Sequence, residues 1–333
     1  MSSAEKLRSF IEESRRVLLT GPAGADGDSI GATLALARGV RALGVEEVFV
    51  AADVPKRYRW MSDAREILPN ATVPSDFDLV IVMDGDRHRL APQVLTAFAN
   101  ARYKVVVDHH RTTSSNGYDL AIVDSTAPAT CTQVMEILDA WEIPLDAKIA
   151  EQLYVGLIYD TGGFRYSNTR PDTHRAAARI LETGIDHATI TSRVLMEVRR
   201  PGMALKAAVL SGARFYGNGQ LVIGCCSAST MAECEADSGD LDGVVESLLY
   251  VEGAEMCVLL VERNPDAVKL SLRSRGDVNV AALAKRLDAG GGGHAKAAGV
   301  VIQVSFQEAL ETLPAICLAT IAEDLQSSGE ARD

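Results

Sequence analysis

The chain has 333 residues, of which 47% are hydrophobic and 23% are charged, so it can form two domains with substantial cores. Its formal net charge of -12 argues against a protein that coats long duplex nucleic acid, so a nucleic-acid partner should be short and meet a local basic pocket. Residues 1–6 lack a signal-peptide pattern, no apolar run would span a membrane, and the six cysteines form no CxxC pair. We therefore expect a cytoplasmic protein with reduced thiols and no membrane partner.

Short apolar runs alternate with helical patterns along the first half of the chain. The runs typical of strands cover residues 17–20, 47–51, 79–83 and 105–107. Helical patterns cover residues 5–16, 29–37, 131–141, 146–158 and 173–183. This alternation predicts an α/β fold with a parallel sheet and helices on both faces.

The pattern changes after about residue 215. Strand-like runs occupy 220–224, 256–262 and 268–275, and a helical pattern over 279–288 leads into a glycine run. These features predict a second, smaller α/β domain. We expect the first domain over 1–190, a linker over 191–215 that contains Pro201 and Gly202, and the second domain over 216–326, with an unstructured tail after it.

Acidic residues follow the predicted strands of the first domain at the point where each strand ends. Asp26 and Asp28 follow the first run, Asp84 follows 79–83, and Asp108 with His109 follows 105–107. In a parallel sheet, ligands bind beyond the carboxyl ends of the strands. Taken singly, these residues could be turn or cap residues, or a histidine pair bonded to main chain. Together with Asp160, they supply the carboxylates and imidazole of a divalent-metal site, and imidazole shifts the preference towards Mn²⁺.

A run of four glycines, residues 290–293, ends at His294 in the predicted second domain. Bare main-chain N–H groups there could approach an anion, with an imidazole beside them. Arg273 stands at the end of a predicted strand, where it could be a solvated residue or a bidentate phosphate contact. The two segments together favour phosphate binding.

These motifs resemble those of the DHH phosphoesterase superfamily, in the branch with a DHH-associated C-terminal domain, and within it the nanoRNase and pAp-phosphatase group. The resemblance covers nearly the whole chain. It rests on these segments: Asp26-Gly27-Asp28 with Ser29-Ile30-Gly31, Asp84, Asp108-His109-His110, residues 156–166 and residues 291–299.

The resemblance implies a site for two Mn²⁺ ions, with Mg²⁺ as the alternative. The implied ligands are Asp26, Asp84 and Asp160 for the first ion, and Asp28, Asp84, His109 and Asp160 for the second. Asp84 and Asp160 would bridge the two ions.

The resemblance also implies catalytic and substrate-binding roles. Asp108 would orient the ring of His109, and His110 would stabilise charge at the scissile phosphate beside the bridging Asp160. In the second domain, the residues implied to hold a terminal phosphate are Arg273, Ser274, Gly292, Gly293 and His294.

One departure from the family pattern concerns the first metal. The family's first motif opens with a His four residues before the first Asp, and this position is Pro22 here. Three interpretations stay open: a weaker first site, a single ion, or a nucleotide-binding protein without turnover. Residues 128–132 also lack the Ser and Glu of relatives, which concerns substrate contact.

We therefore expect a metal-dependent phosphoesterase that hydrolyses short nucleotides, namely di- or oligoribonucleotides or pAp. The alternatives are a cyclic or linear dinucleotide phosphodiesterase and a catalytically silent nucleotide-binding protein. A processive exonuclease is disfavoured by the negative charge and by the 5% aromatic content. A homodimer is compatible with the sequence, which does not decide the oligomeric state.

Overall fold

The computed structural model describes residues 2–330, with side chains described up to 327. The chain divides into two compact units, and the division falls between Glu197 and Val198. The predicted linker 191–215 is therefore split between the units. Pro201, which suggested a connector, lies in the first turn of helix α8 (Arg200–Ser211), a position that proline favours because it needs no N–H donor there.

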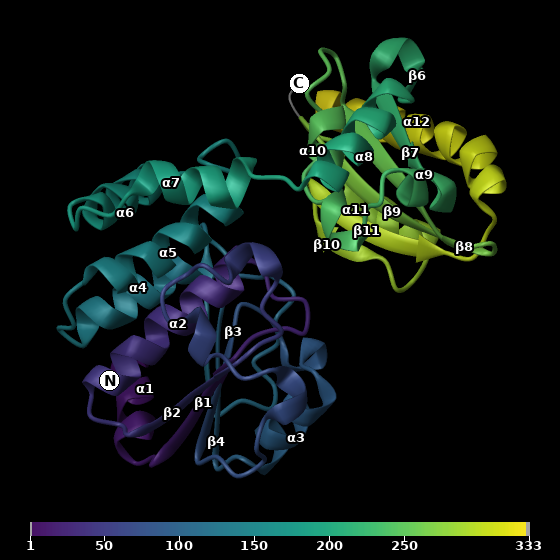
Figure 1. The fold of residues 1–333 in the computed structure, drawn as a ribbon. Coiled ribbons are helices and arrows are strands. Elements are labelled where there is room, and N and C mark those ends of the chain that lie inside the picture. Colours follow the sequence, from purple (N-terminus) through teal and green to yellow (C-terminus); the bar gives the residue numbers. More distant parts are fainter. Residues whose placement is uncertain (1, 331–333) are drawn as a thin grey trace. The chain divides into compact units, whose positions relative to one another are not determined.

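The first unit is built on a five-stranded sheet whose strands are all parallel, as predicted (Figure 1). Its order is β2-β1-β3-β4-β5. The strands are β1 (Arg16–Thr20), β2 (Glu47–Ala51), β3 (Leu79–Met83), β4 (Tyr103–Asp108) and β5 (Leu120–Val123). The central strand β3 is buried along its whole length, which explains its continuous apolar sequence.

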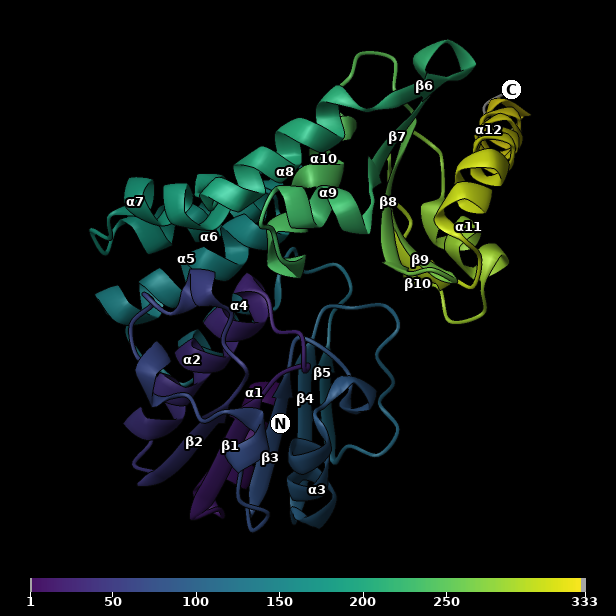
Figure 2. The ribbon, with the colours of Figure 1, turned by 45° about the vertical axis from the view of Figure 1, so that its right-hand side comes forward.

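Helices cover both faces of this sheet (Figure 2). The helices that pack around the sheet are α1 (Ser3–Glu12), α2 (Gly27–Ala42), α3 (Pro92–Asn100), α4 (Thr130–Ala140) and α5 (Ala147–Asp160). The helices α6 (Pro171–Leu181) and α7 (His187–Thr191) pack against α5. Alternate strand residues serve the two cores: Leu79 and Ile81 pack with α2, α4 and α5, whereas Val80 and Val82 pack with α3.

Helices α2 and α5 approach each other closely because of small residues in α2. A Cβ atom placed on Gly31 would lie 2.3 Å from the carbonyl oxygen of Gln152 in α5. Glycine at this position therefore permits the packing. The close approach brings the start of α2 and the end of α5 to the same edge of the sheet, beyond the carboxyl ends of the strands.

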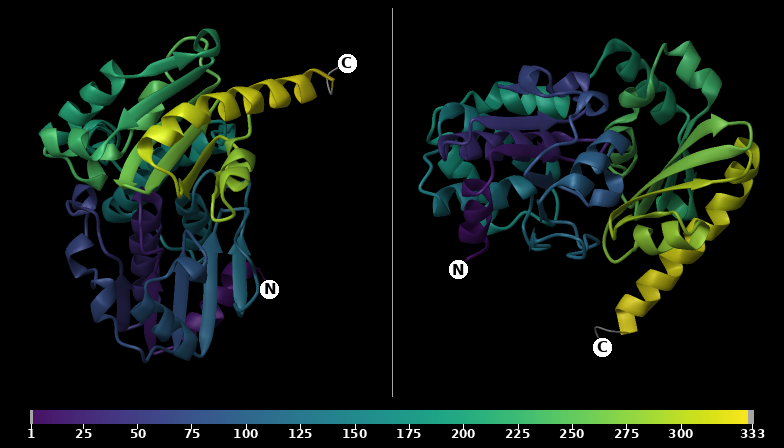
Figure 3. Two further views of the ribbon diagram at one scale, coloured as in Figure 1. Left: turned by 90° about the vertical axis from the view of Figure 1, so that its right-hand side faces the viewer. Right: turned by 90° about the horizontal axis from the view of Figure 1, so that it is seen from below.

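The second unit is built on a six-stranded sheet in the order β10-β11-β9-β8-β7-β6, mixed in direction because β7 and β8 are parallel (Figure 3). The strands are β6 (Arg214–Tyr216), β7 (Leu221–Cys226), β8 (Met256–Asn264), β9 (Ala267–Ser274), β10 (Gly292–His294) and β11 (Ala297–Ile302). This unit confirms the predicted second α/β domain.

Two groups of helices pack on the faces of this second sheet. One face carries α11 (Val280–Leu287) and α12 (Phe306–Glu330), and the other carries α8, α9 (Ala228–Glu233) and α10 (Val244–Leu248). Because α12 continues to Glu330, the predicted unstructured tail is helical as far as that residue, and 331–333 lie outside the described residues.

All six cysteines are free of disulfide bonds. Within residues 2–330, none of the helices combines the length and the hydropathy that a bilayer crossing requires.

Candidate metal centre

The two acidic residues of the first motif have different local roles. Asp26 is the N-cap of α2, and its Oδ1 accepts hydrogen bonds from the main-chain N–H groups of Asp28 (3.0 Å) and Ser29 (3.1 Å). The cap is therefore Asp26 and not Asp28. Asp28 is fully buried in the first turn, where Oδ2 accepts from Thr130 N (2.6 Å) and Oδ1 from Cys131 N (2.9 Å).

Asp84 follows β3 in a conformation that is unusual for a residue with a side chain. Its φ is +56°, in the left-handed region, and its main-chain N–H donates to the carbonyl of Val107. The buried carboxylate accepts a hydrogen bond through Oδ1 from the Thr130 hydroxyl (3.1 Å). The same oxygen lies 3.6 Å from Nε2 of His109 and 3.7 Å from Nδ1 of His110.

His109 contributes a ring nitrogen to the centre. Its Nε2 lies 2.9 Å from Oδ2 of Asp160, the last residue of α5. Its Nδ1 lies 3.2 Å from the main-chain oxygen of Ala127, which orients the ring. The prediction that Asp108 orients this ring is wrong, because the contact of Asp108 with His109 is to its main-chain N–H (2.7 Å) and not to its ring.

Asp108 orients His110 instead. Its fully buried carboxylate contacts the Nδ1 of His110 (2.7 Å) and also accepts hydrogen bonds from the main-chain N–H of His110 and from the Thr113 hydroxyl. Burial raises the pKa of this carboxyl, but the hydrogen bonds and the charge of His110 outweigh burial and lower the pKa overall. Asp108 is therefore held as an anion beside His110.

Burial and mutual repulsion disfavour the charged form of the carboxylates around His109. Burial, followed by the charges of Asp26 and Asp28, raises the pKa of Asp84 well above its usual value. Burial and the charge of Asp28 raise the pKa of Asp160 to about 7. The pKa of His109 is about 9, because the contact with Asp160 outweighs the opposing effect of burial.

Two groups of side chains in this centre have ligand atoms within 4.8 Å of one another: Asp28, His109 and Asp160, and Asp84, His109 and His110. Repelling carboxylate oxygens with one imidazole nitrogen are a donor set that suits a divalent cation. Three of the four residues predicted for the second ion, Asp28, His109 and Asp160, thus lie together, and Asp84 lies beside His109 in the other group. Among the described residues, Asp26 joins neither group.

Pro22 is buried next to the centre. A Cβ atom placed on Gly85, the residue after Asp84, would lie 3.6 Å from the ring of Pro22. The proline side chain offers no ligand atom, so it leaves the predicted first-metal set with carboxylates alone. A weaker first site therefore stays a prediction, as do the alternatives of a single ion and of binding without turnover.

In the second unit, the predicted phosphate-binding side chains have protein partners. Arg273 contacts Oε1 of Glu246 through Nε and Nη2, each at 2.9 Å. The Ser274 hydroxyl is buried and donates to the carbonyl of Val278 (2.7 Å). A contact between Ser274 and a phosphate would require that hydrogen bond to break.

Main chain crowds Gly291 and Gly293, whereas Gly292 between them is uncrowded. A Cβ atom on Gly291 would lie 2.3 Å from the oxygen of Ala284 in α11, and one on Gly293 would lie 2.4 Å from the oxygen of Ala297 in β11. Packing therefore requires glycine at both positions. Gly292 has open space around it, on the edge strand β10, and His294 at the end of this strand is exposed. Gly292 is thus the position that packing within the unit leaves unexplained.

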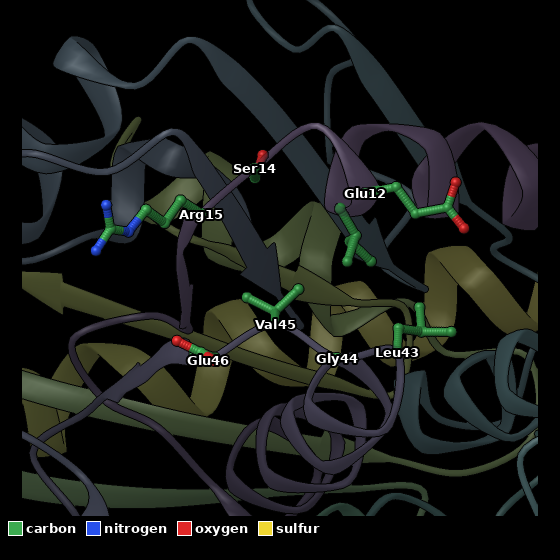
Figure 4. A pocket seen from close by; sticks show the side chains of 8 residues that line it. Glu12, Ser14, Arg15, Leu43, Gly44, Val45 and Glu46 are labelled. Carbon is green, nitrogen blue, oxygen red and sulfur yellow. The ribbon is translucent and has the colours of Figure 1, made fainter.

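A pocket lies at the end of the first sheet where β1 and β2 begin, opposite the carboxyl ends of the strands (Figure 4). Its lining includes Glu12, Arg15, Leu43 and Glu46. None of the predicted site residues lines it.

The sequence-based reasoning missed the groups that hold the metal-centre side chains in place, above all Thr130 and the carbonyl of Ala127. One signal was available. Helix α4 begins after Ala129, which has no capping side chain, so the first N–H groups of the helix need an acceptor from elsewhere. Nothing in the sequence showed that this acceptor is Asp28.

Comparison with known proteins agrees with this architecture. Residues 16–157 match the DHH family N-terminal domain, and residues 221–319 match the DHHA1 domain. The chain is 34% identical over 307 residues to the bifunctional oligoribonuclease and PAP phosphatase NrnA of Thermus thermophilus, covering 91% of this chain and 88% of that protein. It is 26% identical to the cyclic-di-AMP phosphodiesterase GdpP of Geobacillus thermodenitrificans, of which it covers 48%.

A solved structure shares the fold over nearly the full length. An exopolyphosphatase-related protein from Bacteroides fragilis superposes with a TM-score of 0.87, at 21% identity and 96% coverage of both chains. The two domain matches and the relative that is 34% identical over most of both chains establish that this chain belongs to the DHH family of phosphoesterases.

Proposed function

We propose that this protein is a Mn²⁺-dependent phosphoesterase that hydrolyses short nucleotides, either di- and oligoribonucleotides or pAp. The observation that carries the proposal is the gathering of Asp28, His109 and Asp160 at one sheet edge, with Asp84 beside them. The 34% identity to an oligoribonuclease and PAP phosphatase over most of both chains supports the substrate class.

Divalent ions bound there would act as Lewis acids towards the phosphate and lower the pKa of water. One ion would be held by four side chains, Asp28, Asp84, His109 and Asp160. The other would be held by three carboxylates, those of Asp26, Asp84 and Asp160. Mg²⁺ is the alternative ion.

His110 would contact the scissile phosphate. Asp108 fixes its ring through Nδ1, which restrains the imidazole in one orientation before substrate binds. A positioned imidazole can stabilise charge that develops on phosphate oxygen.

The second unit would bind a phosphate remote from the reaction through Arg273, Ser274, Gly292, Gly293 and His294. Because Glu246 holds Arg273 by two nitrogens, the guanidinium is oriented in advance, and Nη1 also donates to the carbonyl of Leu272. An Arg273→Ala substitution should raise KM far more for pApA than for a small phosphodiester such as bis-p-nitrophenyl phosphate. An equal loss on both substrates would contradict this role.

The decisive experiment is hydrolysis of pApA and pAp by the purified protein with Mn²⁺ or Mg²⁺, with Asp160→Ala as control. Turnover that depends on Mn²⁺ and is lost in Asp160→Ala is expected. Faster hydrolysis of cyclic-di-AMP than of pApA would instead favour the phosphodiesterase alternative, which the similarity to GdpP suggests. Tight nucleotide binding without turnover would instead favour the alternative of a catalytically silent nucleotide-binding protein, which Pro22 in place of the family's His suggests.

The proposed partner is a short nucleotide and not a long duplex, consistent with the net charge of -12. A cytoplasmic location and a homodimer remain predictions. Size-exclusion chromatography with light scattering would decide the oligomeric state.

A further inference from the structure

We propose that Thr130 is a positioning residue of the metal centre, whose hydroxyl fixes the orientation of the Asp84 carboxylate. The inference rests on the proposed function, since it concerns how the metal ligands are held. Thr130 is the first residue of α4 and is fully buried. It contacts two candidate ligands that come from two other parts of the fold.

The main chain of Thr130 holds one of these ligands. Its N–H donates to Oδ2 of Asp28 at 2.6 Å, and the next N–H, of Cys131, donates to Oδ1 at 2.9 Å. Ala129 provides no capping side chain, so these helix-end donors would otherwise lack partners. The start of α4 therefore binds a carboxylate of the protein itself, and the partial positive charge there favours the anion.

The side chain of Thr130 holds the other ligand. Its hydroxyl lies 3.1 Å from Oδ1 of Asp84, the oxygen that also faces His109 and His110. A donor on this oxygen restricts rotation of the carboxylate and leaves its remaining lone pair for a cation. The main chain of Asp84 is in the left-handed region, and the Thr130 hydroxyl adds a contact that fixes the side chain as well.

The helix itself offers a matched comparison two residues later. The Thr132 hydroxyl donates to the main-chain oxygen of Ala129 at 2.7 Å, so its hydrogen bond goes to main chain and not to a carboxylate. Both threonines lie in the first turn of α4. Removing either hydroxyl alters the same helix end, but only Thr130 contacts a candidate metal ligand.

The test is isothermal titration of the full chain with MnCl₂ alone. Thr130→Val should weaken Mn²⁺ affinity by about 10- to 100-fold, the usual effect of removing a group that orients a metal ligand. Thr130→Ser should restore most of the affinity, and Thr132→Val should leave it at the wild-type value. Equal Mn²⁺ affinities for Thr130→Val and Thr132→Val would overturn the proposal.

A second measurement separates positioning from folding. Thermal unfolding in EDTA should differ little between Thr130→Val and Thr132→Val, and at saturating Mn²⁺ the KM for pApA should stay near the wild-type value. If Thr130→Val does not fold, Thr130→Ala provides the same comparison with less crowding.

The result is independent of turnover. Weakened Mn²⁺ binding in Thr130→Val supports positioning even if the wild type fails to hydrolyse pApA, a failure that would contradict the proposed function alone. A wild-type protein that binds no Mn²⁺ would overturn both proposals.

Discussion

The candidate metal centre of the first unit and the glycine-rich segment of the second unit are built on opposite principles. In the metal centre, protein donors or acceptors fix Asp28, Asp84, Asp108 and His109. In the glycine-rich segment, Gly292 faces open space and His294 is exposed. A small, hard cation requires ligands held within narrow limits, whereas a larger ligand supplies its own contacts to an open edge.

This contrast predicts that the metal centre supports the reaction and that the glycine-rich segment supports substrate binding. Substitutions in the metal centre should act on metal binding and turnover together. Substitutions at the glycine-rich segment should act on KM.

Asp84→Asn should lower Mn²⁺ affinity and pApA hydrolysis by more than about 100-fold, since groups that merely orient ligands account for 10- to 100-fold. Asparagine tolerates the left-handed conformation of this position. The substitution removes one of several repelling carboxylates, so the metal-free protein should melt at a higher temperature. Titration with MnCl₂, hydrolysis assays and melting in EDTA check this. Asp139→Asn, at a surface ion pair with Arg179, is the control.

Gly156→Ala should disrupt the centre from the neighbouring helix. The added Cβ would lie 2.4 Å from Oδ1 of Asp28 and 2.2 Å from Sγ of Cys131, so α5 must shift. We expect a loss of about 1–3 kcal/mol in the free energy of unfolding, measured by urea denaturation, together with weaker Mn²⁺ binding. Gly24→Ala, where a Cβ meets no atom within 4 Å, should preserve both. Unchanged stability in Gly156→Ala would show that the helices are not closely packed here.

The glycine run should divide into packing and contact positions. Gly291→Ala places a Cβ against the main chain of Ala284 and should cost about 1–3 kcal/mol of stability. Gly292→Ala should leave the unfolding midpoint near that of the wild type and raise KM for pApA, with kcat unchanged at saturation. A KM unaffected by Gly292→Ala would argue that this edge strand does not contact substrate.

Stability of the chelator-treated protein should fall as pH rises. The pKa of Asp160 is raised to about 7, so between pH 4 and 7 the folded chain holds a proton that the unfolded chain releases. His109, with its pKa raised to about 9, loses its stabilising contribution as pH rises from about 6.5 through 9. Melting temperatures in EDTA at pH 5, 7 and 9 should therefore decline.

Added Mn²⁺ should counter this decline, because metal binding favours deprotonated ligands. The pH slope in EDTA should be smaller in Asp160→Asn, which cannot release this proton. Identical slopes for Asp160→Asn and the wild type would contradict the assignment.

The sequence by itself determined the fold class and the chemistry of the centre. Apolar β-branched runs followed by Asp84 and Asp108 predict parallel strands with acids at one edge, because strand direction fixes where each run ends. Glycines at 290–293 predicted a close main-chain approach, although for Gly291 and Gly293 the approaching group is the protein itself.

Only the tertiary structure decided which groups contact the candidate ligands. Asp108 contacts the ring of His110 and not that of His109, and Thr130 lies 46 residues along the chain from the Asp84 that it contacts. Such pairings depend on how α2, α4 and α5 pack against one another. Local sequence patterns encode residue type and the periodicity of each element, but they do not encode the distances between elements that are remote in the chain.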